Sequence, residues 1–406
     1  MYFAGIIAEY DPFHNGHAWQ LAAARAHGAK YVAVALSCGL TQRGALPLLP
    51  ESVRVAAALA SGADLVFALP APYACAGAEA FAQAGVALLS AAGCDGLVFG
   101  AETPDPALLT QTAQLLLTQD YRTALRAALA NGARSFAAAR QAAVQSLCPD
   151  SGAAALLDKP NNNLAVEYCK AILSQGAALT PVPLGRQGAD HGQALGSGGG
   201  PYASASALRR LWTTSGPEAL TDYLPPSALP FYRQAHAQGM DTDFTAAHLA
   251  QLALLRTRTT GPDCFAGVRG VSEGLDHRLY AAVQQAVSWE GLVDAMTTVR
   301  YPRARMRRLA LDAALNYQAD ALPALPPYLH LLGARREALP LLKNAALPVG
   351  HSLAKLARHD PACAKVADAQ RSADALGTLC PRPFGGEISS KNYFFAGFAG
   401  LLKKQT

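Results

Sequence analysis

The chain lacks the long hydrophobic runs and the secretion signals that mark several classes of protein. No apolar stretch in its 406 residues reaches about 18 residues without a polar break, which argues against a membrane span. The first residues have neither the basic start nor the cleavage site of a signal peptide, and they lead straight into an apolar run. We therefore expect a cytoplasmic protein with no membrane partner.

The chain also lacks paired cysteines and has few charged residues. Its eight cysteines are scattered without a C-x-x-C pair, so neither a zinc site nor a disulfide framework is indicated, and no metal ligand is predicted. Charged residues make up 16% of the chain, and hydrophobic residues, many of them alanine, make up 51%. This composition favours helices and a sizeable core, and the length allows two or three domains.

What is present is an alternation of short apolar runs with alanine-rich stretches over residues 1–220. Strands separated by helices form parallel crossovers, so this order predicts an α/β fold with a doubly wound parallel sheet, followed by a mainly α-helical region at 221–406. The expected strands are 3–8, 31–36, 65–69, 96–99 and 179–183. The expected helices are 18–27, 52–61, 77–92, 106–118, 121–130, 135–146, 163–174, 245–256, 277–287, 289–296 and 303–316.

Two segments depart from this pattern. Residues 185–200 are rich in glycine, which predicts either a plain linker or a lid over a bound ligand. Residues 380–406 look β-like or irregular. The sequence contains no internal repeat and no signal for an oligomeric state.

The net charge of +5 is unevenly spread. Residues 1–220 carry 13 Lys and Arg against 14 Asp and Glu, whereas residues 221–406 carry 21 against 15. A near-neutral first part and a basic second part fit catalysis in one and polyanion binding in the other. The densest basic cluster offers charge for RNA phosphates and a tyrosine for stacking, although a solvated helix face is the alternative. Its arginines are Arg300, Arg303, Arg305, Arg307 and Arg308.

The most specific local pattern is a His-x-Gly-His turn directly after the first expected strand. His14 and His17 stand three residues apart, and an expected helix follows them. A helix N-terminus carries unpaired N–H groups and a partial positive charge, so it suits a phosphate. Gly16 allows close approach of a ligand to the backbone. We expect both imidazoles to stabilise charge on an α-phosphate during adenylyl transfer.

A second constellation lies at the start of a later helix. Ser204 and Ser206 precede Arg209, and together they can hold the β- and γ-phosphates of a nucleotide. The alternative is an ordinary N-cap serine with a solvated arginine. Its position downstream of the His-x-Gly-His turn favours the nucleotide site.

These two motifs resemble those of the H-x-G-H nucleotidyltransferase superfamily. Further strings, in order along the chain, are similar to the tRNA(Met) cytidine acetate ligase family: GIIAEYDPFHNGH (5–17), QRG (42–44), GADLV (62–66), FGAE (99–102), NNNLAVEY (161–168) and VSEGL (271–275). The resemblance implies a Rossmann-like nucleotidyltransferase domain. Two positions differ, because the family usually has Asn where Asp11 stands and Lys where Glu51 precedes Arg54. Glu51 inverts the charge at that position.

The resemblance implies an ATP-dependent ligase that forms acetyl-adenylate from acetate and ATP. The acetyl group then passes to N4 of the wobble cytidine of elongator tRNA(Met). ATP is the implied nucleotide substrate, Mg²⁺ is its expected companion, and tRNA is the implied partner. Three of the implied ATP-binding residues have a local alternative, which is a turn glycine for Gly100, an N-cap for Asn161 and a solvated loop arginine for Arg186. The implied ATP-binding residues are Ile7, Ala8, Glu9, Tyr10, Asp11, Pro12, Phe13, His14, Asn15, Gly16, His17, Ala18, Trp19, Gln20, Gly100, Asn161 and Arg186.

Two other functions remain open on the sequence. A small-molecule adenylyltransferase of cofactor biosynthesis would share the His-x-Gly-His turn but would need no basic helical region. A tRNA-binding protein without catalysis would keep the basic region, but the intact histidines and serines argue against a decayed site. The ligase is the hypothesis that uses both parts of the chain.

Overall fold

The computed structural model describes residues 1–185 and 200–378, apart from positions 242, 262, 264 and 273. Within these residues a seven-stranded sheet has the order β5-β4-β1-β2-β3-β6-β7. The first five strands run parallel, and β6 pairs antiparallel with β3 and parallel with β7. The strands are β1 (Phe3–Ala8), β2 (Tyr31–Ser37), β3 (Leu65–Leu69), β4 (Gly96–Ala101), β5 (Thr180–Gly185), β6 (Leu329–Ala334) and β7 (Val349–Gly350).

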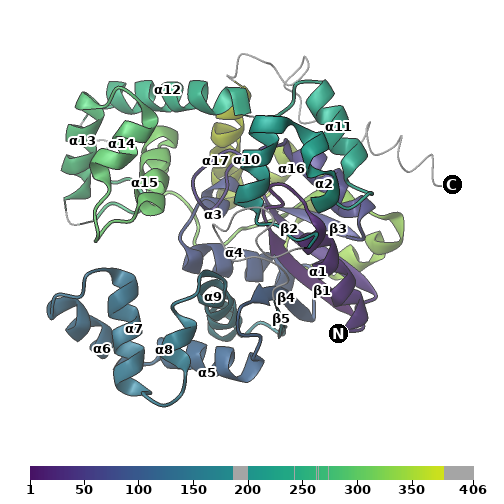
Figure 1. Ribbon diagram of the computed structural model, residues 1–406, viewed down its shortest axis with the longest axis horizontal. Coiled ribbons are helices and arrows are strands. Elements are labelled where there is room, and N and C mark those ends of the chain that lie inside the picture. Colours follow the sequence, from purple (N-terminus) through teal and green to yellow (C-terminus); the bar gives the residue numbers. More distant parts are fainter. Residues whose placement is uncertain (186–199, 242, 262, 264, 273, 379–406) are drawn as a thin grey trace.

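Helices cover both faces of the sheet (Figure 1). Successive residues of β1 point to opposite faces, so Phe3 packs in one core and Ala4 and Ile6 pack in the other. The first core is completed by α4 (Ala78–Ala91), α5 (Pro106–Leu117) and α9 (Pro160–Gln175). The second is completed by α1 (Asn15–Ala26), α2 (Glu51–Ala60), α10 (Ala205–Ser215), η1 (Pro217–Tyr223) and α11 (Leu229–Ala237).

Two helical bodies extend from this core on the left of Figure 1. One is a lobe of α6 (Gln119–Ala130), α7 (Phe136–Leu147) and α8 (Ala153–Leu156). The other is a bundle of α12 (Asp243–Thr259), α13 (Leu275–Gln285), α14 (Trp289–Met296) and α15 (Arg303–Leu315), with its own buried core. Leu40 and helices α3 (Ala71–Ala74) and α17 (Pro361–Thr378) join that core, which attaches the bundle to the sheet domain. The remaining elements are η3 (Arg336–Asn344) and α16 (Leu353–Leu356).

The predicted α/β fold with a helical second part is confirmed, but two strands were missed, β6 and the two-residue β7. Residues 329–334, expected to lie in a helical region, form β6 beside β3. The segment LHLLGA contains no β-branched residue, so its local propensity does not indicate a strand. Pairing with β3 and burial of Leu329 and Leu332 stabilise it instead.

Other differences concern element ends and the division of the chain. Helix α1 begins at Asn15 and α9 at Pro160, each three residues before its predicted start, and β5 runs on to Gly185. Because β6 and α11 come from beyond residue 220 yet pack in the sheet domain, the predicted parts 1–220 and 221–406 share their cores. That division stays a prediction. The predicted lid is described only at its ends, and residues 380–406 lie outside the described range.

In the described part of the chain, no helix has both the length and the hydropathy of a membrane span. The described cysteines, Cys38, Cys75, Cys94, Cys148, Cys169 and Cys363, form no disulfide with one another. Five of them are buried, as expected for small apolar side chains.

Candidate active site

A pocket with a cavity of about 310 Å³ opens beyond the carboxyl ends of β1 and β4. From β1 the chain proceeds to β2 and β3 on one side, whereas β4 and β5 lie on the other, so the strand order reverses here. Ligands of open α/β sheets bind at such a point. The pocket is lined by twelve of the predicted ATP-binding residues, namely Ile7, Ala8, Glu9, Tyr10, Asp11, His14, Gly16, His17, Trp19, Gln20, Gly100 and Asn161.

The other predicted residues lie around this pocket or outside the described range. Pro12, Phe13, Asn15 and Ala18 belong to the same turn and helix but do not line the cavity. Arg186 is not among the described residues. The sequence analysis did not identify ten lining residues, most of which come from elements distant along the chain: Gln42, Arg43, Phe81, Phe99, Leu164, Tyr168, Leu184, Tyr202, Ala203 and Ala205.

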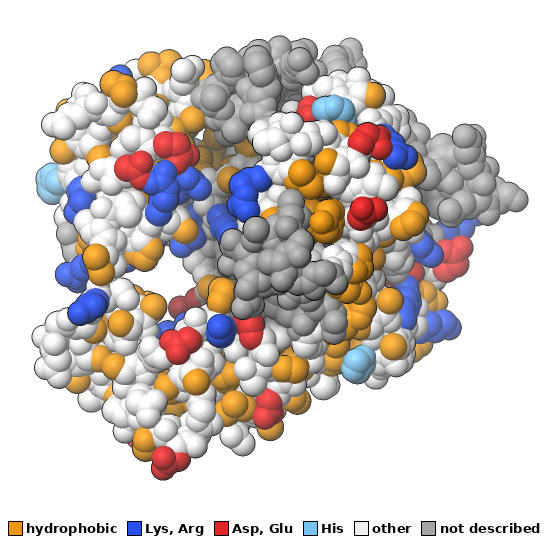
Figure 2. Space-filling view, viewed as in Figure 1, with side chains coloured by type: hydrophobic (Ala, Val, Ile, Leu, Met, Phe, Trp, Pro, Cys, Tyr) orange, Lys and Arg blue, Asp and Glu red, His pale blue; other side chains and the backbone are white. Residues whose placement is uncertain are grey.

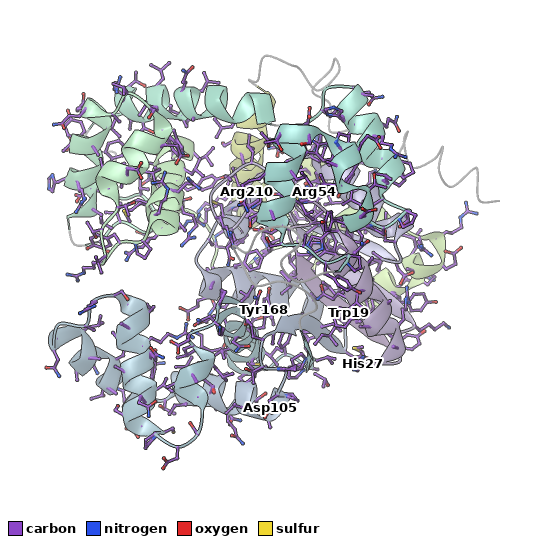
Figure 3. The ribbon with its side chains drawn as sticks, viewed as in Figure 1. Trp19, His27, Arg54, Asp105, Tyr168 and Arg210 are labelled. Carbon is purple, nitrogen blue, oxygen red and sulfur yellow. The ribbon has the colours of Figure 1, made fainter. Side chains whose placement is uncertain are left out.

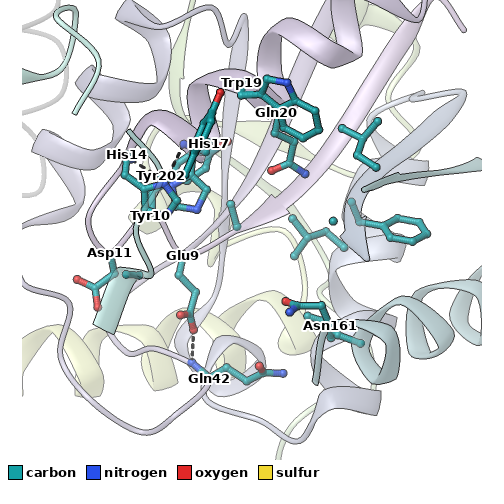
Figure 4. Close-up of a pocket in the computed structure, with 18 of the residues that line it drawn as sticks. Glu9, Tyr10, Asp11, His14, His17, Trp19, Gln20, Gln42, Asn161 and Tyr202 are labelled. Atoms are coloured by element: carbon teal, nitrogen blue, oxygen red, sulfur yellow. Dashed lines mark hydrogen bonds between the residues drawn. The ribbon is translucent and has the colours of Figure 1, made fainter. Parts of the chain in front are cut away.

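The His-x-Gly-His turn forms the N-terminus of α1 through a reciprocal cap. The Gly16 N–H donates to Nδ1 of His14 at 3.1 Å, and the His14 N–H donates to Nδ1 of His17 at 3.3 Å. The two rings stack with centroids 3.8 Å apart (Figure 4). Since each Nδ1 accepts a hydrogen bond, the neutral imidazoles carry their protons on Nε2. The cap therefore supplies two N–H donors without requiring either ring to be charged.

The backbone before this cap is held by contacts from distant helices. Tyr10 has a positive φ of 50°, an uncommon conformation for a residue other than glycine. The Phe13 N–H donates to the hydroxyl of Tyr232 on α11 at 2.6 Å, and Tyr232 is fully buried. Asn15 Nδ2 donates to the carbonyls of Pro201 and Asp222 at 3.0 and 2.9 Å. Residues that follow position 200 in the chain thus hold the His-x-Gly-His turn in place.

Asp11, which departs from the family pattern, is buried and fully engaged. Its Oδ1 accepts the Leu48 N–H at 2.6 Å, and its Oδ2 pairs with Nη1 of Arg209 at 3.1 Å. Arg209 also donates to the Asp11 carbonyl at 2.6 Å. The carboxylate that replaces the usual amide therefore forms an ion pair with a residue predicted to bind phosphate.

Of the two predicted serines, Ser204 forms the N-cap of the local alternative, and neither serine lines the cavity. Ser204 is the N-cap of α10, where its side chain accepts the Ala207 N–H at 3.3 Å. The Ser204 and Ser206 hydroxyls lie 3.2 Å apart. Of the three residues, Arg209 contacts the His-x-Gly-His turn through Asp11, and contact of all three with phosphate stays a prediction.

Glu9 brings a carboxylate into the pocket and is held by the loop after β2. Its Oε1 accepts the Gln42 N–H at 2.6 Å (Figure 4). Burial raises the pKa of Glu9, and repulsion from Asp11 adds to that, whereas the Gln42 hydrogen bond and the charges of Arg209 and Arg43 oppose it. Arg308 of α15 donates to the Gln42 carbonyl at 3.0 Å, so the helical bundle supports this loop.

Arg54 is a buried arginine that braces the strand ends beneath the pocket. Its side chain is 1% exposed and donates to the carbonyls of Glu9 and Ser37 at 2.7 and 2.9 Å and to that of Leu49 at 3.2 Å. Arg54 lies among the buried apolar residues of α2 (Figure 3). In the sequence, this arginine within an apolar helix entered only the family resemblance. Glu51 begins the same helix.

On the far side of the pocket, Asn161 is the second residue of α9. It lies opposite the His14–His17 pair (Figure 4). Its Nδ2 donates to Oε1 of Glu102 at 2.6 Å. Gly100, at the end of β4, is exposed. The pocket thus has polar groups at the starts of α1 and α9, and Glu9, Gln42 and Arg43 add polar groups that belong to neither helix.

The predicted RNA-binding arginines lie on α15 and in the turn before it, where two of the five are paired with carboxylates. Arg303 pairs with Glu290 and Asp294 of α14, and Arg307 pairs with Glu290 at 2.8 Å. The guanidinium groups of Arg300 and Arg305 lie over the Tyr301 ring, and Arg308 contacts Gln42. Basic and acidic side chains gather together along the gap between the bundle and the α6–α8 lobe (Figure 2). RNA binding by these arginines stays a prediction.

Known proteins resemble this chain over most of its length. The HIGH Nucleotidyl Transferase family model matches residues 1–375. The chain is 35% identical to the tRNA(Met) cytidine acetate ligase of Syntrophotalea carbinolica, covering 84% of both chains. It is 31% identical to the protein of that name from Listeria monocytogenes, covering 86% of this chain and 89% of the relative.

Solved structures agree with the sequence matches. Thermotoga maritima TmcAL bound with alpha-thio ATP superposes with a TM-score of 0.84 at 25% identity, covering 98% of both chains. The apo form of the same protein also gives a TM-score of 0.84, at 28% identity and 93% coverage of both chains. The resemblance predicted from the motifs is confirmed. The chain belongs to the HIGH nucleotidyl transferase family and, within it, to the family of the tRNA(Met) cytidine acetate ligases.

Proposed function

We propose that the protein forms acetyl-adenylate from ATP and acetate and transfers the acetyl group to N4 of the wobble cytidine of elongator tRNA(Met). The observation that carries this proposal is the reciprocal cap at the start of α1, which presents two histidine donors inside the pocket at the sheet's switch point. The names of the relatives supply the acetate and the tRNA. ATP as substrate is further supported by the nucleotide analogue in the Thermotoga maritima structure.

In the first step, the ATP phosphates bind at the N-terminus of α1, where the helix dipole and the Nε2–H groups of His14 and His17 stabilise the α-phosphate. Acetate is already ionised at pH 7, so its attack on the α-phosphorus, which breaks the α–β phosphoanhydride bond and releases pyrophosphate, requires alignment and charge neutralisation more than a base. Mg²⁺ would be held by the phosphate oxygens of ATP and by water, and it would neutralise part of the phosphate charge. Arg43 brings positive charge into the pocket, and Arg209, which is paired with Asp11, lies next to the turn.

In the second step, the cytidine N4 attacks the acetyl carbonyl and AMP leaves. The exocyclic amine is a weak nucleophile, so it requires an activated acyl donor. The apolar side chains of Phe81, Phe99 and Leu164 line the pocket and limit the access of water to that donor. The expected cytoplasmic location belongs with this proposal, because its acceptor is a tRNA.

The test is incubation of the full chain with ATP, carbon-labelled acetate and total tRNA. Label in tRNA, lost when ATP is omitted, is the expected result. ATP–pyrophosphate exchange that depends on a different carboxylate or phosphate substrate would favour a cofactor adenylyltransferase. Retained tRNA binding with no exchange under any condition would leave a binding protein without catalysis.

A further inference from the structure

The amide of Asn161 is held by one carboxylate at the start of α9. Glu102 Oε1 accepts both the Asn161 Nδ2 hydrogen bond, at 2.6 Å, and the Asn161 backbone N–H, at 3.2 Å. Glu102 Oε2 accepts the Asn162 N–H at 2.7 Å. The segment after β4 thus caps the first turn of α9 with a side chain from outside the helix.

The position of Glu102 is itself fixed by the neighbouring residues. Asn162 is 1% exposed, its Oδ1 accepts the Thr103 N–H at 2.9 Å, and its Nδ2 donates to the Thr103 hydroxyl at 3.2 Å. These bonds tie the residue that follows Glu102 to the buried Asn162 of α9. The carboxylate therefore has little freedom to turn away from Asn161.

The ionised state of Glu102 decides how the Asn161 amide is oriented. Desolvation raises the pKa of Glu102, but the hydrogen bonds from Asn161 and Asn162 outweigh it, and the pKa lies below its ordinary value. An ionised carboxylate has no proton to donate, so only the NH₂ group of the amide can face it. The side-chain oxygen of Asn161, Oδ1, is then the part of the amide that can accept a hydrogen bond from a ligand in the pocket that this residue lines.

We propose that Glu102 is a positioning residue that sets nucleotide specificity by fixing Asn161 as a hydrogen-bond acceptor for the nucleoside part of ATP. The proposal rests on the proposed binding of ATP with its phosphates at α1, because Asn161 lies at the opposite end of the pocket (Figure 4). The donors of the adenosine moiety are its 6-amino group and its two ribose hydroxyls. A nucleotide that lacks the matching donor leaves the Asn161 oxygen without a partner.

The experiment is calorimetric titration of the full chain with ATP and three analogues, in the absence of acetate and tRNA. Purine riboside triphosphate lacks the 6-amino group, and 2′-deoxy-ATP and 3′-deoxy-ATP each lack one hydroxyl. We expect one analogue to bind about three- to tenfold more weakly than ATP, as for the loss of one hydrogen bond. The analogue affected identifies whether the base or the ribose supplies the donor.

The Glu102→Gln variant tests the positioning role. A glutamine amide can donate as well as accept, so the Asn161 amide is free to turn, and the preference for ATP over that analogue should fall toward onefold. Asn161→Ala should remove the same preference while leaving Glu102 to cap α9. The matched control is Asp105→Asn, which changes another helix-capping carboxylate, bonded to the N–H groups of Ala107 and Leu108. Asp105 lies at the start of α5, away from Tyr168 of the pocket (Figure 3), so this control should keep the wild-type preference.

Two outcomes would overturn the inference. In one, all three analogues bind as tightly as ATP. In the other, the preference persists unchanged in folded Glu102→Gln and Asn161→Ala proteins. Absence of ATP binding by the wild type would instead contradict the proposed function. Circular dichroism of each variant identifies any that fails to fold. If Glu102→Gln does not fold, the nucleotide preference of Asn161→Ala decides the test.

Discussion

Replacement of Arg54 by methionine tests how the strand ends under the pocket are held together. The arginine is 1% exposed and donates to the carbonyls of Glu9, Ser37 and Leu49. These acceptors belong to the residue that follows β1, to the end of β2 and to the loop before α2. Methionine approximates the aliphatic volume but leaves three carbonyl oxygens without this donor.

The expected magnitude follows from those three bonds. A hydrogen bond from a charged donor contributes about 1.5–3 kcal/mol, and leaving its buried partner unsatisfied costs a comparable amount. Removing a buried charge offsets part of this loss, because the desolvation penalty disappears with it. We therefore expect Arg54→Met to lower the free energy of unfolding by about 2–4 kcal/mol. ATP affinity should fall as well, because the Glu9 backbone leads into the His-x-Gly-His turn.

The assay is urea denaturation followed by circular dichroism, with ATP binding measured on the folded variant. The control is Arg233→Met, which removes an exposed arginine paired with Glu218 and should leave the urea midpoint close to that of the wild type. An Arg54→Met protein with the wild-type midpoint and wild-type ATP affinity would refute the bracing role of Arg54.

Three further predictions concern contacts made from outside the first 220 residues. Tyr232→Phe should cost about 1–3 kcal/mol, because it leaves the Phe13 N–H unsatisfied, and denaturation with Tyr223→Phe as control measures this. Glu290→Gln should free charge on Arg303 and Arg307, so RNA binding measured in a filter assay should tighten and depend more steeply on salt, and an unchanged salt slope would argue against these arginines. Burial and then the nearby Glu51 charge raise the pKa of Asp374 to about 7, so the folded chain keeps a proton that the unfolded chain loses above about pH 4. Stability from this group should fall as pH rises from about 4 to 7, and Asp374→Asn should remove that part of the slope in urea titrations.

The sequence predicted the first turn well because its signals are local. A strand, a proline, a glycine and two histidines follow one another within residues 3–17, and each has a direct effect on the backbone nearby. The same is true of the α/β order, which depends on alternating runs. The start of α1 was placed three residues late, because His14 was interpreted as a phosphate ligand and not also as the N-cap.

The parts that the sequence did not predict depend on contacts between distant residues. Tyr232 reaches Phe13 across more than two hundred residues, and Gln42 contacts both Glu9 and Arg308. The arginine cluster looked like an open basic surface, because its partners Glu290 and Asp294 lie on a different helix. Propensity gave no indication of β6, because pairing with β3 decides its conformation.

The central claim is that the His-x-Gly-His turn at the start of α1 performs adenylate formation. The most direct measurement is acetate-dependent ATP–pyrophosphate exchange by His17→Ala, compared with His27→Ala at the other end of the same helix. We expect His17→Ala to lose the exchange while its affinity for tRNA stays unchanged, and His27→Ala to keep both. Exchange at the wild-type rate in a folded His17→Ala protein would contradict the account.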